Sequence, residues 1–177
     1  MIHLITGGSG SGKSRYAEQQ ILDLGPAKRI YIATMHAYDE ESVKRIERHR
    51  AMRAEKEFET IECYLKLHEQ PIPEGANVLV ECISNLCANE MFDPGGAGIH
   101  TIDAVLKGIS HVADAAENLV IVTNEVFSDG VSHDNSTRFY QEYMGAINQE
   151  LALLADKVTE VVYGIPLLIK EQQTETE

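Results

Sequence analysis

The feature that most constrains the fold is a glycine-rich motif close to the start of the chain. Residues 7–14 read G-G-S-G-S-G-K-S and match the pattern G-x-x-x-x-G-K-[ST] at every fixed position. An apolar run of strand character, residues 2–5, precedes the motif, and apolar residues at helical spacing follow it over residues 15–24. This strand–loop–helix setting predicts a phosphate-binding loop rather than a chance glycine–serine segment.

The residue types of the motif suit a chain of phosphates. Glycines let backbone N–H groups turn inward and approach phosphate oxygens without an intervening Cβ. The helix that follows offers unpaired N–H groups and the positive end of its dipole. Lys13 adds a mobile positive charge for the β- and γ-phosphates, and the Ser14 hydroxyl is placed to hold Mg²⁺. The motif therefore predicts binding of a nucleoside triphosphate with Mg²⁺.

Length and charge narrow the class of protein. A chain of 177 residues fits one domain, which we expect over residues 1–170, with a frayed tail at residues 171–177. The 28 acidic and 15 basic residues give a formal net charge of −13, which argues against nucleic acid or an anionic membrane as the main partner. No apolar run approaches the ~18 residues of a membrane-spanning helix, so we expect no span.

Cysteine usage predicts the compartment. Cys63, Cys82 and Cys87 are an odd, scattered set without a C-x-x-C pair, which indicates reduced thiols rather than disulfides or a zinc site. The chain begins directly with the first strand and shows no signal-peptide pattern. We therefore expect a cytoplasmic protein.

Strand and helix patterns alternate along the chain. After the first strand and helix, we expect strands at residues 29–34, 77–82, 119–125 and 158–163, and helices at about 39–57, 85–91, 99–117 and 137–156. Residues 58–64 form a short apolar segment, 93–98 and 128–136 are loops, and a turn at 164–166 leads into an apolar tail. The predicted class is α/β and P-loop NTPase-like: a mainly parallel sheet with helices on both faces.

In such folds ligands collect at the carboxyl ends of the strands. Thr6, Thr34, Glu81 and Asn124 all lie at predicted strand ends. Glu81 closes an apolar strand, the position at which P-loop enzymes keep the carboxylate that orients Mg²⁺. A loop-facing surface carboxylate is the alternative for Glu81. For Glu62, functional and surface roles stay equally open.

The predicted helix after the second strand is unusually basic. Lys44, Arg45, Arg48, Arg50 and Arg53 fall within ten positions, and 100° per residue puts Arg45, His49, Met52 and Arg53 on one face. A histidine among arginines is held neutral by like charge, which favours a nucleophile or base, while arginines bind triphosphate oxygens. A solvated amphipathic helix, with acids first and bases last, is the alternative.

Several sequence segments, in this order along the chain, resemble the bifunctional adenosylcobinamide kinase / adenosylcobinamide-phosphate guanylyltransferase family of cobalamin assembly. They are T-G-G-S-G-S-G-K-S-R-Y-A-E, Y-I-A-T, R-I-E-R-H-R-A-M-R, L-V-E-C-I, V-T-N-E-V and N-Q-E-L-A-L-L-A-D, and the match runs from residue 1 to about residue 170. The resemblance implies that a nucleoside triphosphate, ATP or GTP, phosphorylates adenosylcobinamide. GMP from GTP is then transferred to the adenosylcobinamide phosphate through a guanylyl-histidine, with release of pyrophosphate. It also implies a homotrimer.

The resemblance also assigns roles to particular residues. His49 is the implied nucleophile, Lys13 the second catalytic residue, and Ser14 and Glu81 the Mg²⁺ ligands. The implied nucleotide contacts are Thr6, Gly7, Gly8, Ser9, Gly10, Ser11, Gly12, Lys13, Ser14, Ala33, Thr34, Met35, Arg50, Ala51, Met52, Arg53, Glu62 and Glu81.

The chain departs from the family pattern at two places. Gly10 stands where members usually carry an arginine, and residues 127–133, F-S-D-G-V-S-H, replace a G-x-G-I-V-P stretch. His133 is interpreted as a loop histidine. Two other readings stay open: a P-loop kinase for another small alcohol without a covalent step, and a nucleotide-dependent switch. The absence of an N-K-x-D-like guanine-reading motif counts against the switch.

Overall fold

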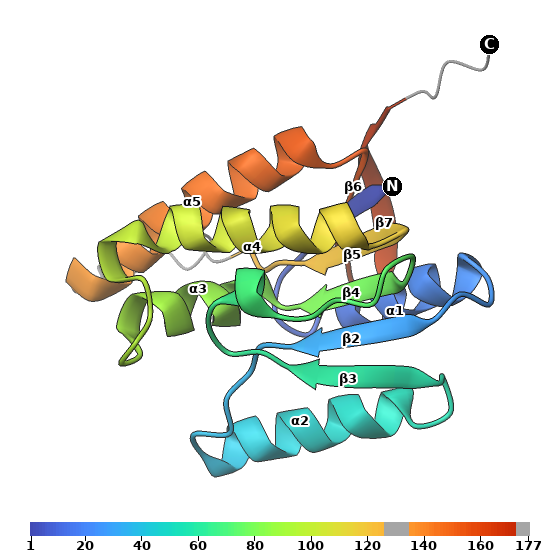
Figure 1. Ribbon diagram of the computed structural model, residues 1–177, viewed down its shortest axis with the longest axis horizontal. Coiled ribbons are helices and arrows are strands. Elements are labelled where there is room, and N and C mark those ends of the chain that lie inside the picture. The colour runs from blue at the N-terminus through green and yellow to red at the C-terminus, as the bar shows by residue number, and fades with distance from the viewer. Residues whose placement is uncertain (126–134, 173–177) are drawn as a thin grey trace.

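A mixed sheet is the centre of the computed structural model, which describes residues 1–125 and 135–172 (Figure 1). Within these residues its order is β3-β2-β4-β5-β1-β6-β7, and every neighbouring pair is parallel except β6 and β7. The strands are β1 (Ile2–Thr6), β2 (Arg29–Ala33), β3 (Phe58–Glu62), β4 (Asn77–Glu81), β5 (Asn118–Val122), β6 (Lys157–Val162) and β7 (Ile165–Glu171).

Helices cover both faces of the sheet, as the alternating pattern predicts. α3, α4 and α5 pack on one face and α1 on the other, while α2 lies at the outer edge beside β3 (Figure 1). The helices are α1 (Lys13–Asp23), α2 (Glu40–Arg53), α3 (Ile83–Phe92), α4 (Thr101–Ala115) and α5 (Asn135–Leu154), with 3-10 turns η1 (Leu67–Glu69) and η2 (Gly98–His100). None of the helices in the described residues has the length and apolarity needed to cross a membrane.

Burial on both faces explains the continuous apolar strands. In β4 all five residues are buried, with Val78 and Val80 in the core under α3, α4 and α5, and Leu79 in the core under α1. Alternate residues of one strand therefore pack into two different cores. This is why these strands lack the alternation of apolar and polar residues found in a sheet with one solvent-exposed face.

Strand register places the glycine-rich loop close to Glu81. β5 lies between β1 and β4, and its Val122 pairs with Ile5 on one side and with Glu81 on the other. The end of β1, from which the loop continues, and the end of β4 therefore lie at the same edge, one strand apart. The topology brings together two segments that are more than sixty residues apart in sequence.

Three local expectations were wrong or incomplete. α2 ends at Arg53 instead of about residue 57, because the backbone turns after Ala54 and Glu57 has a left-handed φ of 56°. Residues 58–62 form a true strand, parallel to β2. The expected apolar tail is strand β7, which pairs antiparallel with β6 and continues to Glu171. Residues 127–133, including His133, and residues 173–177 lie outside the described residues.

Candidate active site

The glycine-rich loop is shaped by close backbone contacts. A Cβ added to Gly7 would lie 2.5 Å from the Val161 carbonyl oxygen, so only glycine fits there. Gly12, at φ 92°, precedes the first residue of α1 and turns the chain into the helix. Lys13 is buried, and its Nζ atom donates to the Gly8 carbonyl oxygen at 2.9 Å, across the loop. Lys13 therefore lies over the concave side of the loop, where phosphates would bind.

Ser14 and Glu81 meet across the edge of the sheet. The Ser14 hydroxyl donates a hydrogen bond to Oε1 of Glu81, whose carboxyl group is 7% exposed. The Oε2 atom of Glu81 is buried and has no hydrogen-bond partner among the described residues. Hydroxyl and carboxylate oxygens are the ligands that Mg²⁺ prefers, and Mg²⁺ in nucleotide sites is held by one or two such groups plus phosphates and water. The pair therefore fits Mg²⁺ brought by a nucleotide.

The described residues contain no cluster of three or more histidine, cysteine, aspartate or glutamate side chains that could hold a metal by themselves. A Mg²⁺ ion at Ser14 and Glu81 would thus depend on phosphate oxygens for most of its coordination.

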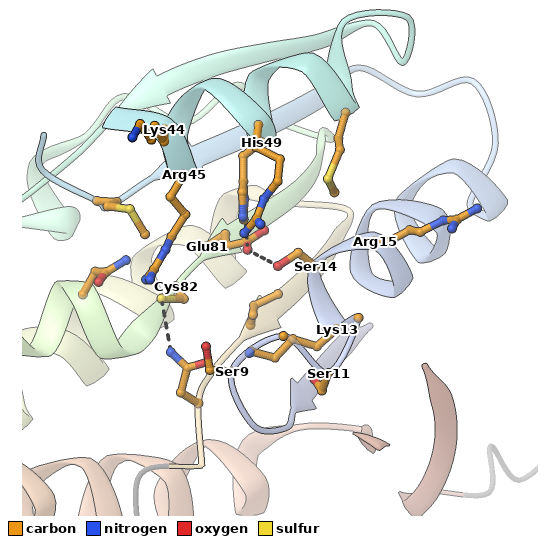
Figure 2. A pocket seen from close by; sticks show the side chains of 18 of the residues that line it. Ser9, Ser11, Lys13, Ser14, Arg15, Lys44, Arg45, His49, Glu81 and Cys82 are labelled. Atoms are coloured by element: carbon orange, nitrogen blue, oxygen red, sulfur yellow. Dashed lines mark hydrogen bonds and ion pairs between the residues drawn. The ribbon is translucent and has the colours of Figure 1, made fainter. Parts of the chain in front are cut away.

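α2 carries His49 to the same place. Asp39 caps the helix, since its Oδ1 atom accepts a hydrogen bond from the Ser42 N–H at 2.7 Å. Near its other end, Arg50 pairs with Glu62 of β3 at 2.8 Å. The Nδ1 atom of His49 lies 3.4 Å from Oε1 of Glu81. Figure 2 shows His49 reaching from α2 toward Glu81 and Arg45 reaching from the same helix toward Cys82, with Ser14 and Lys13 on the opposite side.

The electrostatic surroundings keep His49 neutral. Burial lowers the pKa of His49, and the nearby guanidinium groups of Arg53 and Arg48 lower it further. Burial also lowers the pKa of Lys13, while Glu81 acts in the opposite direction. Burial raises the pKa of Glu81, and the hydrogen bond from Ser14 opposes this effect. A neutral imidazole has a lone pair on one ring nitrogen, so His49 can attack an electrophile at neutral pH.

Two cavities meet at His49 and Glu81. The first, about 700 Å³, extends between the glycine-rich loop and α2. The second, about 310 Å³, lies between α2 and the strands β2 and β3. Seven of the fifteen basic residues of the chain line one or both cavities, although the chain is acidic as a whole: Lys13, Arg15, Lys44, Arg45, Arg48, Arg50 and Arg53. This concentration of positive charge suits a polyanionic ligand.

Most predicted site residues line these cavities. Ser9 to Ser14 and Met52 line the first, Ala33, Arg50, Arg53 and Glu62 line the second, and Met35, His49 and Glu81 line both. All four residues of the predicted helix face line a cavity: Arg45 and His49 line both, Met52 lines the first and Arg53 lines the second.

Five predicted residues line neither cavity: Thr6, Gly7, Gly8, Thr34 and Ala51. Thr34 is buried, and its hydroxyl both donates to the Cys82 carbonyl oxygen and accepts from the Cys82 N–H. Its polar group is therefore used to join two strand ends. Ala51 is exposed on the outer side of α2. The Gly8 carbonyl oxygen accepts hydrogen bonds from Lys13 Nζ and from the Ser11 N–H.

Some lining residues were not among the predicted contacts. Cys82 and Asn85 line both cavities, and Asn124 lines the first, where its side chain donates to the Ser84 hydroxyl at 2.6 Å. All three residues follow the carboxyl ends of β4 and β5, where ligands collect in parallel sheets, so their sequence positions could have indicated a place in the site. Tyr31 lines the second cavity from the middle of an apolar strand, where sequence gave no sign of a polar role.

Curated relatives are similar to this chain over almost its whole length. "Bifunctional adenosylcobalamin biosynthesis protein CobU" of Escherichia coli (strain K12) is 36% identical over 184 residues, covering 96% of this chain and 100% of the relative. "Bifunctional adenosylcobalamin biosynthesis protein CobP" of Pseudomonas aeruginosa is 31% identical over 176 residues, covering 96% of this chain and 98% of the relative.

Solved structures show the fold class. An ATPase of the type III secretion system of pathogenic bacteria superposes with a TM-score of 0.56 at 12% identity, over 90% of this chain and 50% of that one. This likeness confirms the P-loop NTPase-like α/β class. The family described as "Cobinamide kinase / cobinamide phosphate guanyltransferase" matches residues 3–169. With that match and its curated relatives, this chain belongs to the cobinamide kinase / cobinamide phosphate guanyltransferase family of cobalamin biosynthesis.

Proposed function

We propose that this chain phosphorylates adenosylcobinamide with a nucleoside triphosphate and then converts the product to adenosylcobinamide-GDP. In the second reaction GMP passes from GTP to His49 and from His49 to the corrinoid phosphate, with release of pyrophosphate. Family membership supports both activities. The observation that supports the assignment of roles to residues is the position of His49, which lines both the cavity at the loop and the second cavity under α2.

The loop and its cations supply the phosphate site. Backbone N–H groups of residues 8–12, the start of α1 and Lys13 would hold the β- and γ-phosphates, while Ser14 and Glu81 would hold Mg²⁺. When bound, Mg²⁺ neutralises charge on the phosphate oxygens. In the kinase reaction these groups would orient the γ-phosphorus toward the corrinoid hydroxyl.

A GTP molecule that extends across both cavities would bring its α-phosphorus to His49. Its triphosphate would lie along the loop, and its nucleoside would enter the second cavity, lined by Ala33, Arg50 and Glu62. A neutral ring nitrogen of His49 then attacks the α-phosphorus as the bond to pyrophosphate breaks. Arg45 and Arg48 lie in the first cavity, where they would stabilise the negative charge that develops on pyrophosphate.

The exposed strand β7 supports an oligomer, for which the resemblance implies a trimer. Ile165 and Ile169 are 61% and 62% exposed, and the neighbouring Tyr163 is 94% exposed. An apolar strand at a sheet edge is a typical surface for association with another chain. The free, buried thiols of Cys63, Cys82 and Cys87 fit the expected cytoplasmic setting.

The function is tested by labelling. Purified protein is incubated with Mg²⁺ and GTP labelled at the α-phosphate, beside the variants His49→Ala and His100→Ala. His100 is exposed and lines neither cavity, so it is the matched control. We expect an acid-labile, alkali-stable label on the wild type and the control, and none on His49→Ala. Unlabelled wild-type protein that still binds GTP would contradict the transferase and leave a plain P-loop kinase.

A further inference from the structure

Tyr31 is a buried polar residue to which the reaction steps above give no part. It lies at the centre of β2 between Ile30 and Ile32, which face the opposite core. Its side chain is 3% exposed, yet its hydroxyl is directed toward the second cavity, which it helps to line. A buried hydroxyl needs a partner, because an unpaired one is unfavourable away from water.

The ring of Tyr31 is held in place by its neighbours. The guanidinium carbon of Arg53 lies 3.4 Å from the ring centroid, and Phe58 approaches the ring edge-on with centroids 6.2 Å apart. Arg53 is itself buried, and both Arg53 and His49 belong to α2. Stacking of a guanidinium on an aromatic ring is favourable, more so when water is excluded. The Tyr31 ring is therefore fixed relative to the helix that carries the nucleophile.

The Tyr31 hydroxyl points at one particular atom of His49. It lies 3.5 Å from Nδ1, the same ring nitrogen that lies 3.4 Å from Oε1 of Glu81. Burial raises the pKa of Tyr31, so the phenol is neutral and keeps its proton. An interaction with the Tyr31 hydroxyl also opposes the effect of burial on the Glu81 pKa. Both groups thus face the same side of the imidazole, and such contacts tighten when substrate closes a site.

We propose that Tyr31 is a positioning residue which, together with Glu81, holds Nδ1 of His49 inward so that Nε2 is the nitrogen that attacks the α-phosphorus. This inference rests on the proposed function. The Nδ1–H group donates to Glu81 and to the Tyr31 oxygen, while the Tyr31 O–H donates to the carboxylate. Nε2 is then the nitrogen with the lone pair, as in hydrolytic triads where a buried carboxylate fixes the histidine tautomer.

The steps balance without a proton leaving the histidine. The Nε2 lone pair forms the bond to the α-phosphorus, and the electron pair of the broken P–O bond leaves with pyrophosphate. The imidazole becomes an imidazolium whose positive charge faces Glu81 through Nδ1–H. In the second step an oxygen of the corrinoid phosphate attacks the same phosphorus, and the P–N electron pair returns to Nε2.

The variant Tyr31→Phe tests the role, because it removes the hydroxyl and keeps the ring under Arg53. We expect the single-turnover rate of His49 labelling at saturating GTP to fall about 10- to 100-fold, the loss of one hydrogen bond to a charged group. The GTP concentration for half-maximal rate should change by less than about threefold, because the hydroxyl acts through His49. Tyr16→Phe, on α1 and outside both cavities, is the matched control.

Nitrogen-15 NMR of the imidazole gives a second readout that does not depend on turnover. We expect the wild type to hold His49 as the Nδ1–H tautomer and Tyr31→Phe to hold a mixture. A wild-type labelling rate in Tyr31→Phe would overturn the inference, as would a higher half-saturating GTP concentration with an unchanged maximal rate. If the wild type itself forms no label, the proposed function fails. The NMR spectrum tests the positioning role separately, because an Nε2–H tautomer of His49 in the wild type would overturn it.

Discussion

His49 and Glu81 meet through one pair of atoms, Nδ1 and Oε1, which lie 3.4 Å apart. The same Oε1 atom accepts the hydrogen bond of Ser14, the residue placed to hold Mg²⁺. One carboxylate oxygen therefore contacts both the proposed metal site and the proposed nucleophile. In the proposed function, a single buried residue would therefore take part in both phosphoryl transfer and guanylyl transfer.

The change Glu81→Gln should therefore impair both reactions. It keeps the size of the side chain but removes the negative charge that would bind Mg²⁺ and stabilise the imidazolium. We expect the kinase rate and the rate of His49 labelling each to fall at least about 100-fold, the usual scale for a group that acts on the transition state. The two rates are measured separately with γ-labelled and α-labelled nucleotide.

Glu62→Gln is the matched comparison. Glu62 is half exposed, lies in the second cavity and pairs with Arg50, away from the Ser14–Glu81 contact. We expect this variant to raise the GTP concentration needed for labelling more than it lowers the maximal rate. A Glu81→Gln enzyme that loses only one of the two activities would contradict a shared carboxylate.

Sequence predicted the parts of the site that depend on local pattern. The loop of residues 7–14 follows from its glycine spacing, and the shared placement of Arg45, His49, Met52 and Arg53 beside the cavities agrees with helical geometry. Ala51 is exposed and lines neither cavity, although its neighbours Arg50 and Met52 each line one. A resemblance that assigns a continuous stretch of helix to a ligand necessarily includes such outward-facing positions.

Roles that depend on a partner far away in sequence could not be predicted. Tyr31 lies in an apolar strand and reads as a core residue until Arg53 and His49 are seen beside it. Thr34 is predicted to contact the nucleotide because it lies at a strand end, but its hydroxyl is hydrogen-bonded to the Cys82 backbone instead. Strand β7 reads as a tail, because its pairing with β6 requires a reversal at Tyr163 and Gly164, both with positive φ.

Gly7 and Gly8 offer a direct test of the loop geometry. In Gly7→Ala the new methyl group would lie 2.5 Å from the Val161 oxygen and 2.7 Å from the Ser11 hydroxyl oxygen, at a φ of 153°. We expect the free energy of unfolding to fall by about 1–3 kcal/mol, together with weaker triphosphate binding. Around Gly8 no atom lies within 4 Å of the added Cβ, so Gly8→Ala should change stability by less than about 0.5 kcal/mol.

Urea denaturation of both variants measures the difference. An equal loss of stability in the two would mean that the contact with Val161 is not what requires glycine at residue 7. The slope against urea concentration should stay the same, since neither change alters the surface exposed on unfolding.

Lys170 of β7 should stabilise the end of α5. Its Nζ atom donates to the carbonyl oxygens of Ala152, Leu153 and Ala155 at 3.0, 3.0 and 2.7 Å. These carbonyl groups lie at the end of the helix, where partners are lacking and the dipole favours a cation. Lys170→Met should lower the free energy of unfolding by about 1–2 kcal/mol. The exposed Lys107→Met should change it by less than about 0.5 kcal/mol, as thermal or urea unfolding would show.

His3 should make the fold sensitive to acid. It is buried in β1, its Nε2 atom lies 2.8 Å from the Thr159 hydroxyl oxygen, and burial, with the nearby charge of Lys157, lowers the pKa of His3 to about 4. The unfolded chain has the ordinary histidine pKa of about 6.5 and so binds the proton more readily than the folded chain. The contribution of neutral His3 to stability is therefore complete above about pH 6.5 and is lost as the pH falls toward 4. Its full size is on the order of 3 kcal/mol.

The variant His3→Gln tests this dependence, because glutamine can still bond to Thr159 but does not titrate. Urea unfolding measured between pH 7.5 and pH 4 should give a steeper loss of stability for the wild type than for His3→Gln. The difference between the two curves should develop below about pH 6.5 and stay constant above it. Parallel curves across the whole range would show that His3 has the same pKa in the folded and unfolded chains. That result would contradict the effect of burial and of the Lys157 charge on the His3 pKa.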